Sequence, residues 1–221
     1  MRKEHTNEWV TISDLMAGVA AMIMLLLVVT FVQASVVAAE NERKKQQGVE
    51  SAIAEIREIL EDRPDIKGVV IVDRNIRLTD QSFRSGSACL SDETRLLLEE
   101  HVAPIIINTL KTHPNIEIQI EGHTDPMPVA KICTDLSVGC ALFDDNYSLS
   151  AGRAREARKA LISSIEQPET LRLIGKKTAV VGYGPDRLLN TEDQMASENR
   201  RVEIKLMVVE EMMDIVSIKD K

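Results

Sequence analysis

An uninterrupted apolar segment near the N-terminus dominates the hydrophobic pattern of the chain. Residues 15–32 carry no charged side chain, and mostly apolar residues continue to about residue 39. A run of roughly 18 or more apolar residues is long enough to cross a bilayer as a helix. The pattern therefore predicts a membrane-spanning helix over residues 9–39, preceded by a short polar N-terminus of residues 1–8.

A cleaved signal peptide is the alternative explanation for this segment. Arg2 and Lys3 could form its charged start, and residues 36–38 could imitate a cleavage site. The apolar region of a signal peptide is normally about 7–15 residues long, so the longer run favours a retained helix. Lys and Arg flank the run on both sides, so charge alone does not orient it.

One acidic residue, Asp14, lies at the start of the apolar run. An ionisable group at the edge of the hydrocarbon is costly, and it usually faces a partner or a wet cavity. Asp14 could simply cap the helix, because Asp favours the N-cap and the positive end of the dipole. Alternatively, its carboxylate could lie against a partner within the membrane.

A charged, helix-prone segment is expected over residues 40–66, before Pro64 ends the helix. Val49, Ile53, Ile56 and Leu60 recur at helical spacing and predict an apolar stripe. This stripe could be the packing face of a connector helix. It could also be a surface for dimerisation or for contact with a membrane partner.

Strands and helices alternate in residues 67–210, which are followed by a C-terminal tail of residues 211–221. This order predicts an α+β layered sandwich (β-α-β-α-β-β) with helices on one face of the sheet. The expected elements are two short strands within 68–78, a helix capped by Ser91 and reaching Thr112, a strand over 116–121, a helix from Tyr147 to about Glu166, and strands over 177–183 and 201–208.

The composition argues against nucleic-acid binding and against a metal centre. The net charge is −8 and aromatic residues make up 3% of the 221 residues, so neither a basic groove nor a stacking platform is expected. The three cysteines and four histidines show no metal-ligand spacing. We expect no metal, no cofactor and no enzymatic activity.

Four motifs in the C-terminal part resemble the OmpA-like peptidoglycan-binding domain: Glu-Gly-His-Thr-Asp (121–125), Asn-Tyr-Ser-Leu-Ser-Ala-Gly-Arg-Ala (146–154), Val-Gly-Tyr-Gly (181–184) and Asn-Arg-Arg-Val-Glu-Ile (199–204). The resemblance implies that Asp125 and Arg153 grip the diaminopimelate of the peptidoglycan stem peptide, together with Thr124 and Asn146.

The chemistry of these two charged residues fits such a ligand. Diaminopimelate carries an ammonium and a carboxylate on one carbon, and Asp125 and Arg153 supply the matching charges. The alternative is that the two side chains merely form a surface salt bridge with each other. Arg200 and Arg201, in the last motif, could cap the sheet edge or bind an anion.

The N-terminal segment resembles the B subunit of ion-driven stators such as flagellar MotB. The resemblance rests on Trp-Val-Thr-Ile-Ser-Asp-Leu-Met-Ala-Gly (9–18), followed by an apolar run and an OmpA-like domain. Residues 13–18 are most similar to the MotB-like subunits of the Zorya anti-phage defence system. The resemblance implies that Asp14 carries the translocated ion, which could be H⁺ or Na⁺.

The same resemblance implies a location and partners. It predicts a single-pass protein of the bacterial inner membrane, with residues 1–8 in the cytoplasm and the C-terminal domain in the periplasm. The expected partners are membrane lipid, a second copy of the chain, and a multi-helix protein of the MotA/ExbB/ZorA type that forms a pentamer around the dimer. A flagellar stator subunit and a passive cell-wall tether are the alternatives.

A periplasmic domain is exposed to an oxidising compartment, so a disulfide is expected. Cys133 and Cys140 bracket a short loop between Asp125 and Asn146, and a short loop closes at low entropic cost. This favours a Cys133–Cys140 bridge. Cys89 is the competitor, because the start of the first helix and the end of the next strand meet at the same sheet edge.

Overall fold

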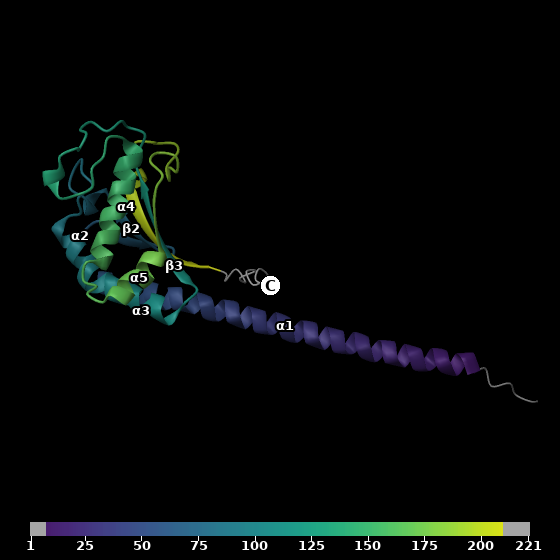
Figure 1. The fold of residues 1–221 in the computed structure, drawn as a ribbon. Coiled ribbons are helices and arrows are strands. Elements are labelled where there is room, and N and C mark those ends of the chain that lie inside the picture. Colours follow the sequence, from purple (N-terminus) through teal and green to yellow (C-terminus); the bar gives the residue numbers. More distant parts are fainter. Residues whose placement is uncertain (1–7, 210–221) are drawn as a thin grey trace, which may run out of the picture. The chain divides into compact units, whose positions relative to one another are not determined.

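The computed structural model describes residues 8–209. These residues fall into two compact units that divide between Lys44 and Lys45. Helix α1 (Glu8–Glu61) contributes to both units (Figure 1). The helix ends three residues before Pro64, which agrees with the expected stop.

The N-terminal unit is the apolar part of α1, whose described side chains are exposed. Ser13, Thr30 and Ser35 donate their hydroxyl hydrogens to carbonyl oxygens of the same helix, three or four residues earlier. Polar groups within a bilayer must be satisfied in this internal way. By length and composition, α1 is the one described helix that could cross a membrane.

The C-terminal turns of α1 belong to the globular unit. Val49, Ala52, Ile53 and Ile56 are buried in its main hydrophobic core. Gly48 permits close packing here, because a Cβ at this position would lie 2.7 Å from the His113 ring. The predicted apolar stripe is therefore a packing face within the domain, the simpler of the two interpretations.

A five-stranded sheet in the order β1-β2-β5-β3-β4 forms the centre of the globular unit. Strands β3 and β4 are parallel, and the other neighbours are antiparallel. The last strand of the chain is thus inserted between β2 and β3. The strands are β1 (Val69–Val72), β2 (Asn75–Thr79), β3 (Ile116–His123), β4 (Thr178–Gly182) and β5 (Arg201–Val208).

Helices cover one face of this sheet (Figure 1), where Ile118, Ile120 and Ile204 are buried in the core. The helices are α2 (Asp92–Leu97), α3 (Ala103–Thr112), α4 (Asn146–Ile162) and α5 (Pro168–Lys176), with a π-helical turn (Leu98–Val102) between α2 and α3. The predicted layered α+β fold is confirmed. Ser91 caps α2 as expected, accepting a hydrogen bond from the Thr94 amide.

Two features of the helical layer differ from the sequence prediction. The helix expected to reach Glu166 ends at Ile162, and a second helix, α5, follows it. Pro168 stands in the first turn of α5, where a missing N–H costs nothing. A proline at this position starts a new helix and does not simply mark a loop.

Candidate functional site

The strand register brings three separate chain segments to one edge of the sheet. Thr79 pairs with Arg201, and Arg201 pairs with His123 on its other side. The residues immediately beyond these pairs are therefore neighbours: Asp80 after β2, Arg200 before β5, and Thr124 after β3. They meet although they are far apart in the sequence.

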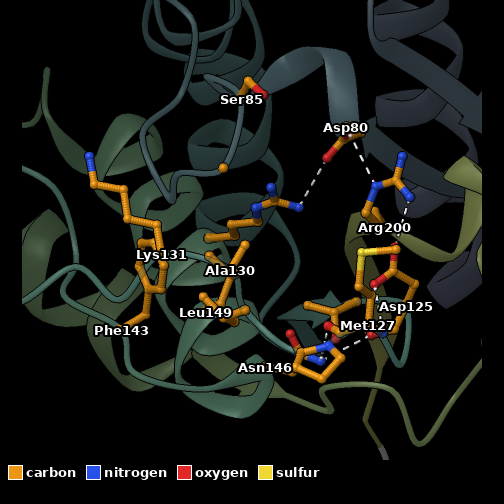
Figure 2. A pocket seen from close by; sticks show the side chains of 15 residues that line it. Asp80, Ser85, Asp125, Met127, Ala130, Lys131, Phe143, Asn146, Leu149 and Arg200 are labelled. Carbon is orange, nitrogen blue, oxygen red and sulfur yellow. Dashed lines mark hydrogen bonds and ion pairs between the residues drawn. The ribbon is translucent and has the colours of Figure 1, made fainter.

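A cavity of about 340 Å³ opens at this edge. All four residues predicted to bind the ligand line it, and Figure 2 shows Asp125 and Asn146 on the same wall as Arg200. Lys131 and Phe143 lie on the opposite side in this view. The lining residues are Asp80, Ser85, Gly86, Thr124, Asp125, Met127, Pro128, Val129, Ala130, Lys131, Phe143, Asn146, Leu149, Arg153 and Arg200.

Helix α4 places Arg153 in the cavity. The helix begins with a capping box, in which the Asp145 carboxylate accepts from the Ser148 amide at 2.6 Å. The Arg153 side chain is buried, donates from Nε to the Ser87 carbonyl at 3.1 Å, and stacks over the Phe83 ring. Burial lowers the pKa of Arg153, against the opposing charge of Asp80, but an arginine stays cationic.

The Asp125 carboxylate is also buried and is held on both oxygens. Its Oδ1 accepts from the Met127 amide at 3.1 Å, and its Oδ2 accepts from Arg200 Nη1 at 2.8 Å. Asn146 supports this loop by donating to the carbonyls of Asp125 and Met127. The Thr124 hydroxyl is buried without a hydrogen-bond partner among the described residues.

Asp125 and Arg153 do not form the direct salt bridge that was the simpler interpretation. The charges instead alternate along a chain of four side chains. Asp80 lies 3.3 Å from Arg153 and 3.4 Å from Arg200, and Arg200 contacts Asp125. The hydrogen bond from Arg200 to Asp125 raises the pKa of Arg200.

Sequence reasoning missed Asp80 and left the role of Arg200 open. Asp80 belongs to none of the four motifs, and only the strand register carries it to the site. Arg200 stands in the last of the four motifs, so the sequence could have indicated that it belongs to the site. Its neighbour Arg201 turns to the other face of the sheet and bonds Glu203 at 2.7 Å, so the two arginines have different surroundings.

Asp14 lies six residues inside α1 and is not its N-cap, so the capping interpretation is wrong. Its side chain is exposed and has no hydrogen-bond or ion-pair partner within residues 8–209. Gly18 follows one helical turn later, and nothing lies within 4 Å of the position that its Cβ would occupy. The surface beside the carboxylate is therefore open to a partner.

The disulfide joins Cys89 to Cys140, and Cys133 is free. The predicted Cys133–Cys140 bridge is wrong, and the competitor, Cys89, takes its place. Backbone hydrogen bonds pair Cys133 with Phe143, whereas Cys140 lies with its Cα 5.4 Å from that of Cys89. Fold geometry thus outweighs the lower entropic cost of closing the shorter loop.

Within the part of the chain that the structure describes, one group of side chains offers ligand atoms for a metal. Glu121, His123 and Glu203 are buried on the sheet face opposite the core, with ligand atoms within 4.8 Å of one another. Lys205 Nζ lies 2.6 Å from Glu121 and 3.1 Å from Glu203. This ammonium already compensates both carboxylates, so the cluster is a charge network that fits a metal poorly.

Comparison with known proteins extends the similarity to the whole chain. No family model matches. The chain is 24% identical over 226 residues to Zorya protein ZorB of Escherichia coli, and the alignment covers 96% of this chain and 92% of ZorB. It is therefore similar to ZorB in both the N-terminal helix and the globular domain.

The chain is also similar to several solved structures, among them MotB-type proteins. A MotB-like protein from Desulfovibrio vulgaris is 20% identical, over 75% of this chain and 98% of that one, with a TM-score of 0.49. The periplasmic domain of Helicobacter pylori MotB is 22% identical, over 63% and 80%, with a TM-score of 0.45. The cell wall anchor of the type VI secretion system of Pseudomonas aeruginosa is 23% identical, over 70% and 97%, with a TM-score of 0.44.

Proposed function

We propose that this chain is a peptidoglycan-anchored stator subunit of an ion-driven membrane motor, of the kind that ZorB represents in the Zorya anti-phage system. The observation that carries the proposal is the cavity that holds a buried Arg153 and a buried Asp125. Helix α1 would anchor the chain in the bacterial inner membrane, and the domain would hold the cell wall from the periplasm.

The cavity suits the zwitterionic end of diaminopimelate. A guanidinium binds a carboxylate through charge-assisted hydrogen bonds, and a carboxylate binds an ammonium in the same way. Because Arg153 and Asp125 are both largely shielded from water, each such bond is stronger than on an open surface. The two groups come from different elements, α4 and the loop after β3, so the folded domain presents them together.

Asp14 would carry the ion. Its carboxylate is exposed on an apolar helix surface and lacks a partner in the described chain, which is costly in a bilayer unless another protein surrounds it. The small Gly18 beside it would let a partner helix approach closely. We therefore propose a second copy of the chain and a multi-helix protein of the MotA/ExbB/ZorA type as partners.

The disulfide supports the periplasmic placement of the domain. Disulfides persist in the bacterial periplasm and are rare in the reducing cytosol. Cys89–Cys140 ties the start of α2 to the loop that precedes α4. Gly86, three residues before Cys89, and Phe143, three residues after Cys140, line the cavity, so a bridge kept in an oxidising compartment would hold its rim in place.

Pull-down on purified peptidoglycan sacculi tests the anchoring role. The full chain in detergent should sediment with sacculi, and Arg153→Ala or Asp125→Ala should raise the dissociation constant, measured by titrating the sacculi, at least about tenfold, the usual cost of losing a charge-assisted contact. The double variant should be little worse than either single one, because both act on one ligand group.

Arg155→Ala is the matched control. Arg155 lies on the same helix, two residues from Arg153, but outside the cavity. Its loss removes the same charge and should leave sedimentation unchanged. Wild-type protein that stays in the supernatant would contradict the anchoring role.

A further inference from the structure

The four alternating charges differ in how much solvent reaches them. The side chains of Arg153 and Asp125 are 4% and 9% exposed, whereas those of Asp80 and Arg200 are 37% and 30% exposed. The buried Arg153 is thus paired with the more exposed Asp80, and the buried Asp125 is paired with the more exposed Arg200. Figure 2 shows Asp80 and Arg200 side by side at this end of the cavity.

We propose that Asp80 determines the ligand specificity of this site, by occupying the place of the ligand carboxylate on Arg153 and rejecting anions that bring no ammonium. This inference rests on the proposed function, since it concerns the same cavity. It assigns the selective role to a residue outside the four sequence motifs.

The contact between Asp80 and Arg153 is suited to being exchanged. Asp80 Oδ1 lies 3.3 Å from Arg153 Nη1, yet this buried nitrogen makes no hydrogen bond of good geometry to any of the described residues. A buried N–H without a hydrogen-bond acceptor is costly. A ligand carboxylate that reaches Nη1 along its N–H direction would make the better bond, and Asp80 could then turn toward solvent.

The second half of the exchange takes place at Asp125. Arg200 bonds its carboxylate at 2.8 Å in the free protein. The ligand ammonium, on the same carbon as the ligand carboxylate, would replace Arg200 as the partner of Asp125. Arg200 would remain paired with Asp80 or with the ligand carboxylate. Every charge stays paired throughout, so a neutral zwitterion can enter without leaving a buried charge alone.

A ligand with carboxylates only would break this balance. Asp80, Asp125, Arg153 and Arg200 sum to zero, and Lys131 is the remaining charged residue of the lining. A ligand carboxylate at Arg153 would displace Asp80, but a ligand without an ammonium could not replace Arg200 at Asp125. Asp80 and the ligand carboxylate would then compete for the guanidinium of Arg153. Like charges at such short range are unfavourable even near a surface.

Two small molecules of equal length separate these cases: meso-diaminopimelate, which carries two zwitterionic ends, and pimelate, which is the same chain without the ammonium groups. Binding of each to the full chain in detergent is measured by calorimetry. Wild-type protein should prefer diaminopimelate. Asp80→Asn should bind pimelate about tenfold more tightly and diaminopimelate nearly unchanged, because one nearby negative charge is removed.

Asp92→Asn is the matched control, since Asp92 pairs with two exposed arginines outside the cavity and carries the same charge. It should leave the ratio of the two affinities unchanged. An Asp80→Asn variant with an unaltered ratio, or with equal loss of both ligands, overturns the role of Asp80 while leaving the cell-wall proposal intact. Wild-type protein that binds neither diaminopimelate nor sacculi overturns both.

Discussion

Gly122 in β3 lies directly against the main chain of Ser150 in α4, so close that a side chain at position 122 would overlap the Ser150 carbonyl group. Gly182, which pairs with Gly122 across β3 and β4, has the same relationship with Ala151. These two glycines let α4 rest on the sheet backbone. The contact sets the position of Arg153, one turn further along α4, relative to Asp125 after β3.

Replacing Gly122 with Ala should move α4 away from the sheet. We expect a loss of about 1–3 kcal/mol in the free energy of unfolding, the usual cost of overpacking, together with weaker sedimentation on sacculi. Denaturant titration in detergent and the sacculus assay measure the two effects. Gly175→Ala is the control, because the nearest atom to its added Cβ lies 3.8 Å away; equal behaviour of both variants would refute the packing argument.

His123 should make the domain sensitive to mild acid. Burial, and the charge of Arg201, lower the pKa of His123 from 6.5 to about 4 in the folded protein. Between these two values the unfolded chain binds a proton that the folded chain does not. The free energy of unfolding should therefore fall as the pH drops from 6.5 to 4, by about 3 kcal/mol in total.

A His123→Gln variant removes this titration. Its stability should be nearly independent of pH between about 6.5 and 4.5, where the wild-type protein loses most of the effect. Below about pH 4.5, protonation of Glu203 lowers the free energy of unfolding further in both proteins. Although burial works against it, Arg201 and Lys205 lower the Glu203 pKa to about 2. If the free energy of unfolding changed with pH equally in variant and wild type above pH 4.5, His123 would be excluded as the cause of the pH dependence.

The Cys89–Cys140 bridge should stabilise the domain substantially. It spans 51 residues, for which chain entropy predicts roughly 4 kcal/mol. Cys89→Ala should lower the free energy of unfolding by up to this amount, whereas Cys133→Ala should have a small effect because Cys133 is free. Peptide mapping without reductant should recover one linked peptide that contains residues 89 and 140; a link through Cys133 would contradict the fold.

Asp14→Asn should abolish ion movement and leave assembly intact. The amide keeps the shape of the side chain but cannot take up and release a proton. The test is ion flux in vesicles that contain the chain with its co-purified membrane partner. Asp14→Glu should retain part of the flux, and Ser13→Ala, which loses only a hydroxyl bonded to its own helix, should retain all of it. Full flux in Asp14→Asn would eliminate the carrier role.

The sequence by itself determined the features that depend on neighbours along the chain. Charge-free residues 15–32 predict an apolar helix because a bilayer or a core must cover them. Ser91 predicts the start of α2 because its hydroxyl reaches an amide three residues on. The motifs that contain Asp125 and Arg153 likewise point to two residues that line one cavity.

Only the tertiary structure decided the features that depend on distance in space. The register of β2 and β5 carries Asp80 to Arg153 and Arg200. The same fold brings Cys140 to Cys89 rather than to the nearer residue in sequence. Spacing along the chain cannot rank such contacts, because the free energy gained by packing the whole sheet and its helices outweighs the small entropic preference for closing a short loop.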